Sequence, residues 1–120
     1  MKRIEIAVVS PKNEQQALLD WAARVDAGEE MAEAESRLFF ATYGQLHSTL
    51  TDKRMDLLEY VAQHEGLNIR QLAADIGRDY KNVYGDVQLL STIGLIEKRD
   101  GVLFAPYDDI NIHKMLRKAA

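Results

Sequence analysis

The sequence of 120 residues contains no cysteine, two prolines and one tryptophan. The absence of cysteine excludes disulfides, zinc–thiolate sites and thiol nucleophiles. No run of about 18 apolar residues is present, so we expect no membrane-spanning helix. The first nine residues are too soon interrupted by charge to resemble a signal peptide, and we therefore expect a cytoplasmic protein.

The sequence also has no excess of basic residues, and its net charge is −4. A DNA-binding domain is usually basic, so the net charge argues against DNA binding. The first 50 residues carry five Lys or Arg and eight Asp or Glu, a balance of −3. The rest of the chain carries ten and eleven, a balance of −1. Because DNA binding depends on the charge of one face rather than on the total, this composition does not exclude it.

The first 49 residues predict a strand followed by a helix. Residues 4–9 are mostly apolar and β-branched, which is typical of a strand. Ser10-Pro11 is typical of a helix start, and apolar residues then recur at helical spacing to about residue 25. Residues 37–41 predict a second short strand or, alternatively, a helix continuing to His47, and periodicity does not decide between them.

From residue 50 onward the pattern predicts three helices and a hairpin. Gln71 lies three residues after a helix-capping asparagine, as in a capping box. Asp100-Gly101 joins two short runs that are typical of strands, 95–99 and 102–105, which is a strong hairpin signal. The predicted N-caps are Thr51, Asn68 and Asp79, and the predicted closing glycines are Gly66, Gly77 and Gly94.

This order of elements predicts a mainly α chain with a small β component, built as a winged helix-turn-helix. We expect a three-helix bundle with a β-hairpin wing, which binds DNA, over residues 50–107. Residues 1–49 would then form an N-terminal strand–helix extension for dimerisation or partner binding, and residues 108–120 a C-terminal tail.

The third predicted helix has the features of a recognition helix. Val83, Val87 and Leu90 fall on one inward-facing sector, which leaves polar side chains on the opposite side to reach base edges. Arginines near the starts of the second and third helices, and a basic pair beside the hairpin turn, suit phosphate groups. The predicted DNA-contacting residues are Arg70, Arg78, Tyr80, Lys81, Asn82, Tyr84, Gln88, Lys98 and Arg99.

Gly85 lies in the middle of this helix, where glycine costs about 1 kcal/mol relative to alanine. One interpretation is that the helix backbone approaches DNA closely at this point. The other is a surface glycine without a role. The sequence leaves both open.

The remaining polar residues predict neither catalysis nor a metal or other cofactor. His47, His64 and His113 lack the spacing of a metal site. Asp108-Asp109 is a pair of carboxylates, but no activated nucleophile or glycine-rich loop accompanies it, and adjacent side chains point in different directions.

The aromatic residues of the N-terminal part are most simply core residues, but one helix pair cannot bury all four of them: Trp21, Phe39, Phe40 and Tyr43. An interface is the natural place for them, because DNA-binding proteins of this kind act as two-fold dimers on paired half-sites. The predicted dimer-interface residues are Ile6, Val8, Leu18, Trp21, Phe39 and Phe40.

Residues 69–73 (Ile-Arg-Gln-Leu-Ala), 77–83 (Gly-Arg-Asp-Tyr-Lys-Asn-Val) and 94–96 (Gly-Leu-Ile), followed by Pro106-Tyr107-Asp108, resemble a known family. The family is that of the MarR-like DNA-binding proteins, winged-helix regulators of prokaryotes, some of which are regarded as antitoxins encoded beside a toxin gene. The resemblance covers about half the chain. It implies a recognition helix from about Asp79, DNA contacts from Arg78 through Tyr84, and an N-terminal part that dimerises or holds a protein partner.

We therefore expect a sequence-specific transcriptional regulator that binds double-stranded DNA as a homodimer and represses its own operon, and not an enzyme. Two alternatives stay open. The chain is then either an antitoxin that also binds a toxin protein, or a protein-interaction module that does not bind DNA.

Overall fold

The computed structural model describes residues 2–9, 19, 34–114 and 116, which include five strands and four helices. The helix expected from Ser10 to about residue 25 lies, apart from Leu19, outside the described residues. Two compact units are present: a sheet unit, Met1–Thr49 with Asp109–Ala120, and a helical unit, Leu50–Asp108. Within the described ranges, no helix is both long and apolar enough to cross a membrane.

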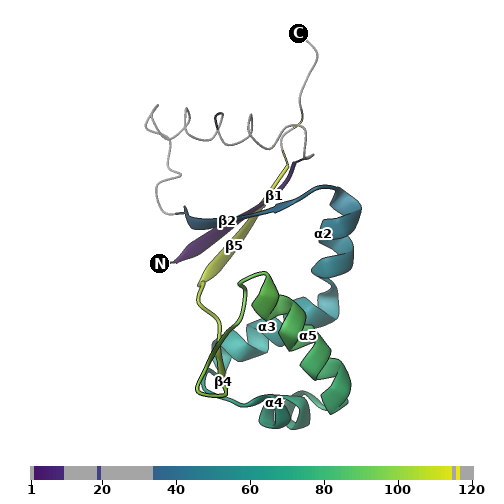
Figure 1. Ribbon diagram of the computed structural model, residues 1–120, viewed down its shortest axis with the longest axis vertical. Coiled ribbons are helices and arrows are strands. Elements are labelled where there is room, and N and C mark those ends of the chain that lie inside the picture. The colour runs from purple at the N-terminus through teal and green to yellow at the C-terminus, as the bar shows by residue number, and fades with distance from the viewer. Residues whose placement is uncertain (1, 10–18, 20–33, 115, 117–120) are drawn as a thin grey trace. The chain divides into compact units, whose positions relative to one another are not determined.

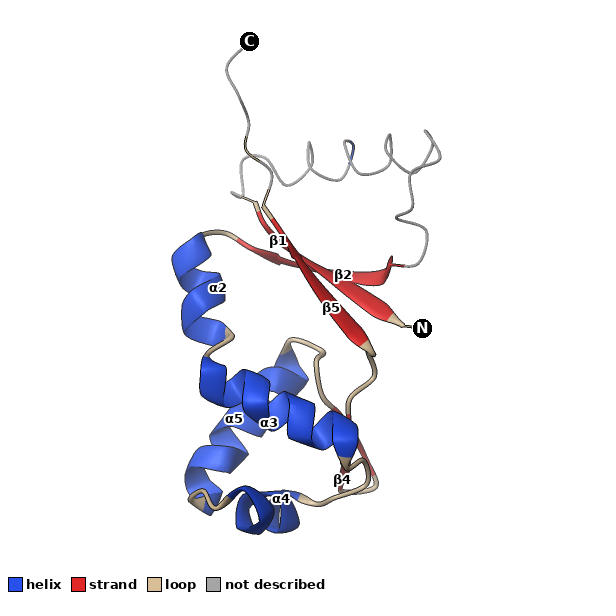
Figure 2. Ribbon diagram, turned by 180° about the vertical axis from the view of Figure 1, so that it is seen from behind, coloured by secondary structure: helices blue, strands red, loops and turns tan. Residues whose placement is uncertain are grey.

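The sheet unit contains a three-stranded parallel sheet. Strand β1 (Arg3–Val8) lies between β2 (Ala34–Phe40) and β5 (Asp109–His113) and runs parallel to both (Figures 1 and 2). Helix α2 (Tyr43–Thr49) follows β2 and contacts it. Residues 37–40 thus belong to a strand, as the first interpretation of this segment predicted. The alternative of a helix that continues from there to His47 is wrong, because a separate short helix begins only at Tyr43.

Polar side chains connect β1 to β5 on one face of this sheet. Arg3 Nε donates to Asp109 Oδ2 at 2.8 Å, and Asn111 Nδ2 donates to Glu5 Oε1 at 2.8 Å. Glu5 is buried, and a buried carboxylate needs such a partner. Burial lowers the pKa of Arg37, while the nearby Glu5 charge raises it. These contacts hold two strands together that lie more than a hundred residues apart in the sequence.

The parallel sheet corrects the expected fold class. A mainly α winged helix-turn-helix with a strand–helix extension is wrong, because the chain is an α/β fold built partly on this sheet. The third strand comes from residues 109–113, which we expected in a C-terminal tail. A parallel partner can come from any distance along the chain, because the connection is not a tight turn that leaves a local signature.

The sheet also corrects half of the predicted dimer interface. Ile6, Val8 and Phe40 are 0%, 7% and 8% exposed, so they belong to the core of the sheet unit and cannot contact a second chain through their side chains. Phe39 is half-buried. Leu18 and Trp21 lie outside the described residues.

In the helical unit, α3 (Asp52–Gln63), α4 (Ile69–Ile76) and α5 (Tyr80–Thr92) precede a hairpin of β3 (Glu97–Arg99) and β4 (Val102–Phe104). All three predicted N-caps are confirmed, since each cap side chain accepts a hydrogen bond from a backbone N–H three residues on. The capping box is also present, with Asn68 N donating to Gln71 Oε1 at 3.0 Å and Gln71 N donating to Asn68 Oδ1 at 2.8 Å.

Backbone conformations with positive φ set both the end of α4 and the hairpin turn. Gly77 ends α4 with φ 65°, the left-handed conformation that glycine adopts without penalty. Asp100 and Gly101 have φ 52° and 78°, and a turn with two positive φ values matches the right-handed twist of the strands that it joins. The Asp-Gly signal therefore located the hairpin correctly.

The core of the helical unit holds α5 and the hairpin in place. β4 is tied to the loop before α4, because Gly66 N donates to Leu103 O and Leu103 N donates to Leu67 O, both at 2.9 Å. The side chains buried in this unit are Leu50, Leu57, Leu58, Val61, Leu72, Ala73, Val83, Val87, Leu90, Leu95, Ile96 and Leu103.

Candidate nucleic-acid interface

Helix α5 has a fully buried side and a solvent-exposed side. Val83, Val87 and Leu90 are 0% exposed, as the helical projection predicted. The exposed residues of the same helix are Tyr80, Lys81, Asn82, Tyr84, Gly85, Gln88 and Thr92. The polar side predicted for DNA is therefore open to solvent.

Five of the predicted contact residues form one connected surface, which we call the cation–aromatic stripe: Arg70, Tyr80, Tyr84, Gln88 and Lys98. The Arg70 guanidinium of α4 lies 5.3 Å from the centre of the Tyr80 ring. The rings of Tyr80 and Tyr84, one helical turn apart on α5, lie 6.2 Å apart and are tilted by 37°. Tyr80 and Tyr84 are 45% and 42% exposed, so part of each ring is open to solvent.

The hairpin completes the stripe at its other end. Lys98 Nζ lies 5.5 Å from the centre of the Tyr84 ring and also donates to Gln88 Oε1. Gln88 Nε2 in turn donates to Tyr84 Oη at 3.2 Å. A cation over each end of an aromatic pair is held by the ring quadrupole while its charge stays exposed to solvent. The stripe therefore presents two cations, two hydroxyls and two ring faces from three elements.

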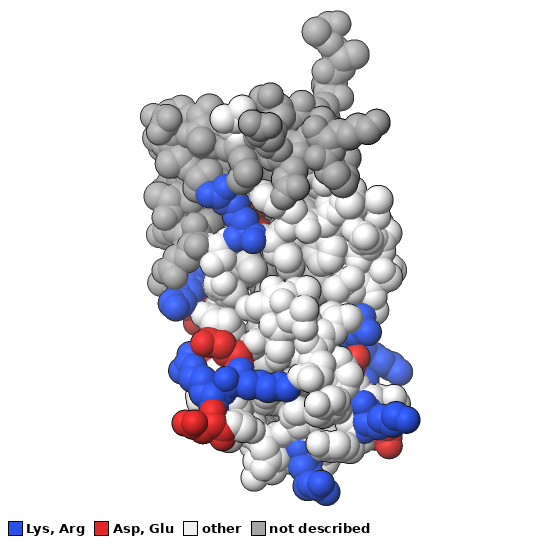
Figure 3. All heavy atoms as spheres, in the orientation of Figure 1, with Lys and Arg blue, Asp and Glu red and all other residues white. Residues whose placement is uncertain are grey.

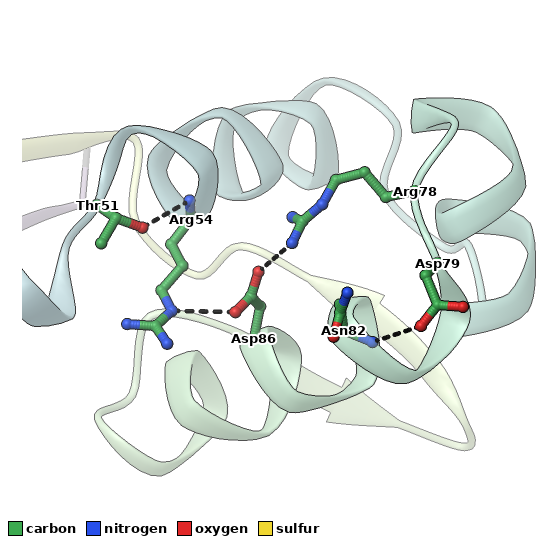
Figure 4. A network of polar contacts seen from close by, with 6 residues as sticks. All are labelled: Thr51, Arg54, Arg78, Asp79, Asn82 and Asp86. Atoms are coloured by element: carbon green, nitrogen blue, oxygen red, sulfur yellow. Dashed lines mark hydrogen bonds and ion pairs between the residues drawn. The ribbon is translucent and has the colours of Figure 1, made fainter.

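Arg78 occupies a different environment, and the structure gives it a second role besides the expected phosphate contact. Its Nη2 donates to Asp86 Oδ2 at 2.7 Å, while Arg54 Nε of α3 donates to Asp86 Oδ1 at 3.0 Å (Figure 4). The side chains of both arginines are 24% exposed and that of Asp86 is 14% exposed. One carboxylate of α5 thus connects α3 and the turn before α5.

The last three predicted residues are exposed but lie outside these two groups. Lys81 and Asn82 are on the first turn of α5, where side chains can meet base edges. Arg99 Nη2 donates to Glu97 Oε2 at 3.0 Å, and its guanidinium lies 4.6 Å from the centre of the Phe104 ring. The hydrogen bond to Glu97, and then the charge of Glu97, raise the pKa of Arg99 above its ordinary value.

The surface charge of the helical unit is divided into patches. On the face drawn in Figure 3, Lys and Arg side chains of this unit form several groups, most with an acidic side chain beside them. Where charges of both signs alternate, attraction of a polyanion depends on local groups such as the stripe rather than on a continuous basic field. Within the described ranges, no three His, Asp or Glu side chains are placed to hold a metal ion.

Gly85 keeps both of its interpretations. It is exposed, and a Cβ built on it would meet no atom within 4 Å beyond its two chain neighbours and the backbone of its own helix. Nothing in the surrounding protein therefore requires glycine at this position. Whether Gly85 has a role depends on whether DNA approaches the α5 backbone here.

Comparison with known proteins places this region in one family. A family model described as HVO_A0114 matches residues 49–112, which is a little over half of the chain. The chain belongs to the HVO_A0114 family. No curated protein matches the chain. The HVO_A0114 match spans the helical unit and continues to Ile112 in β5, so all nine predicted contact residues lie inside it.

Sequence reasoning missed Arg54 and Asp86 as parts of this region. Asp86 is a half-buried acidic residue near the buried side of its helix. Its two partners lie 32 and 8 residues away. No periodic pattern in the sequence relates Asp86 to either arginine. The one signal in the sequence is a carboxylate beside the apolar residues on the inward-facing side of α5.

Proposed function

We propose that the chain is a sequence-specific DNA-binding transcriptional regulator without catalytic activity, which acts in the cytoplasm as a homodimer and represses its own operon. The observation that carries this proposal is the cation–aromatic stripe on the exposed side of α5. In DNA-binding proteins where a tight turn joins two helices, the second helix lies in the major groove, and a tight turn likewise joins α4 and α5. The resemblance to MarR-like regulators supports the same proposal.

The exposed residues divide by chemistry into two groups. Lys81, Asn82 and Gln88 are suited to base edges, because lysine donates to guanine acceptors and amides pair with adenine. Arg70, Lys98 and Arg99 come from the elements on either side of α5 and suit phosphates, which position the protein without reading sequence.

The test of the proposal is binding of the full chain to duplex DNA from upstream of its own gene, measured over a range of salt concentrations. Each neutralised phosphate should steepen the slope of log affinity against log salt by about 0.9. Unrelated duplex of the same length is the control for sequence preference. Absence of binding at low salt would contradict the proposal.

Two substitutions should separate sequence reading from positioning. Lys81→Ala should lower affinity for the preferred duplex by about 1–3 kcal/mol and relax the preference, because a base contact is lost. Arg99→Ala should weaken binding to all sequences alike and flatten the salt slope by about one unit. Equal effects of the two changes on preferred and unrelated duplex would refute this division.

Gly85→Ala should decide between the two interpretations of that glycine. Because the added methyl group meets nothing in the chain, the free energy of unfolding should rise by about 1 kcal/mol. If DNA approaches the α5 backbone here, affinity should fall at least tenfold, which corresponds to about 1.4 kcal/mol. Unchanged affinity together with raised stability would leave Gly85 as a surface glycine without a role.

A protein partner is the second candidate function, and the acidic partners of the arginines favour it. Asp86 and Glu97 already neutralise Arg78 and Arg99 in part, and the net charge of −4 disfavours a polyanion. The chain would then be an antitoxin that holds a toxin, or an interaction module that does not bind DNA. Copurification of one stable partner from the native host, with no DNA binding at low salt, would favour this candidate.

A further inference from the structure

Strand β5 forms one edge of the described sheet. The strand order is β2-β1-β5, so within the described residues β5 has β1 as its only neighbouring strand. An edge strand offers a row of backbone N–H and C=O groups to a further strand. Proteins that keep such an edge free usually place charge, proline or a bulge on it. The central run of β5, Ile110-Asn111-Ile112, contains neither charge nor proline.

The hydrogen bonding to β1 fixes which backbone groups face outward. Asp109 N donates to Lys2 O at 3.3 Å, so the groups of Asp109 point toward β1. In a strand this direction alternates with a period of two residues. The N–H and C=O groups of Ile110 and Ile112 therefore point away from β1, toward the open edge.

The side chains of β5 also leave an apolar surface exposed at this edge. Ile6 of β1 pairs in register with Ile112 of β5, so the two side chains lie on the same face of the sheet. Ile6 is 0% exposed, whereas Ile112 is 51% exposed. The apolar face is thus covered at the central strand and opens to solvent at β5. A strand added beside β5 would continue this face and cover Ile112.

The opposite edge of the sheet does not share this property. Ser36 to Phe40 of β2 are half-buried or buried, so the described part of β2 has no exposed large apolar side chain. Of the two edges, β5 is therefore the one that gains apolar burial from a new neighbour.

We propose that β5 pairs antiparallel with β5 of a second copy of this chain, about a two-fold axis at Asn111. The two three-stranded sheets would then form one continuous sheet. The inference rests on the proposed function for the expectation of a homodimer, but it names a surface, residues 109–113, that lies outside the predicted interface.

The register follows from self-complementarity. A two-fold axis at Asn111 places Ile110 opposite the partner's Ile112, so the outward-facing backbone groups of both chains meet as hydrogen-bonded pairs. On the other face the same axis places Asn111 opposite the partner's Asn111, and Asp109 keeps its ion pair with Arg3 of its own chain. An axis at Ile112 would instead place Ile110 opposite the partner's Lys114. The axis at Asn111 is therefore the one that pairs both isoleucines of β5 with isoleucines of the partner.

The experiment is sedimentation of the full chain at micromolar concentration. The wild-type protein should sediment at twice the chain mass of 13.6 kDa. Ile112→Pro removes an outward-facing N–H, which an edge strand tolerates, and should raise the dimer dissociation constant at least about tenfold. Ile112→Lys should do the same by placing a charge on the apolar face, and it decides the matter if the proline variant does not fold.

The matched control is Tyr43→Lys. Tyr43 belongs to the same unit and is 65% exposed, but it lies on α2 rather than on β5. This variant should remain dimeric. A wild-type monomer, or Ile112 variants that dimerise as tightly as the control, would overturn the inference.

Failure of this inference and failure of the proposed function are distinguishable. A dimer that is lost in the Ile112 variants but binds no DNA would keep the interface and remove the regulator proposal. A monomer that binds its upstream DNA would remove the β5 interface and the homodimer but keep the proposal of a DNA-binding regulator.

Discussion

Asp86→Asn should lower the free energy of unfolding of the helical unit by about 2–4 kcal/mol. The substitution keeps the size of the side chain but removes the negative charge of the carboxylate to which both Arg54 and Arg78 donate. Removal of one partner from a largely buried ion pair leaves an uncompensated charge, which costs more than the pair contributes when intact. Here two guanidinium groups, each 24% exposed, lose one shared anion.

The measurement is urea unfolding of the full chain, followed by far-UV circular dichroism. For a unit of this size, such a loss corresponds to a fall in Tm of roughly 15–30 °C. Asp56→Asn is the matched control, because Asp56 is an exposed residue of α3, and this change should alter the unfolding free energy by less than about 0.5 kcal/mol. Similar unfolding midpoints for the two variants would show that Asp86 does not hold α5 in place.

The Asp86 contacts also separate two kinds of arginine that look alike in a sequence. Arg70 and Arg78 were both predicted to contact phosphate, since each lies near the start of a helix. The structure places Arg70 over the exposed ring of Tyr80, and it places Arg78 against the carboxylate of Asp86. The residue type predicts that an arginine can bind an anion or an aromatic ring. Which of these partners it contacts depends on how the helices pack.

The local elements of the helical unit could be predicted because their signals are local. An N-cap, a capping box and an Asp-Gly turn each involve only three or four consecutive residues. The roles of Thr51, Asn68 and Asp100 can therefore be predicted from the residues next to them. The buried stripe of α5 is likewise a repeat within one helix. These features account for the agreement between residues 50 and 104.

The sheet could not be predicted in the same way. β1 and β5 pair across more than a hundred residues, and a parallel pair has no connecting turn that marks it. The alternation of Ile110 and Ile112 with polar neighbours is a strand signal, but a run of five residues at the end of a chain is equally typical of a tail. Burial of Ile6 follows from that pairing, and so does the correction of the predicted interface.

Arg70→Glu combined with Lys98→Glu should abolish most DNA binding if the regulator proposal holds. These two cations lie at the ends of the cation–aromatic stripe, and one comes from α4 and the other from β3. A hydrogen bond to a charged group contributes about 1.5–3 kcal/mol, so losing two should weaken affinity on the order of 100-fold or more. The salt slope should also fall by about two units, since two fewer phosphates are neutralised.

The effect should depend on the position of the charges and not on their number. Lys53→Glu reverses an exposed charge on α3, outside the stripe, and should change affinity much less. Both variants should unfold at the same urea concentration as the wild-type chain, because exposed charges contribute little to stability. If reversal at Lys53 weakens binding as much per charge as reversal at the stripe, then DNA responds to the net charge of the chain and the stripe is not the contact surface. If neither variant changes the affinity, the rings of Tyr80 and Tyr84 face something other than a phosphate backbone, which favours a protein partner.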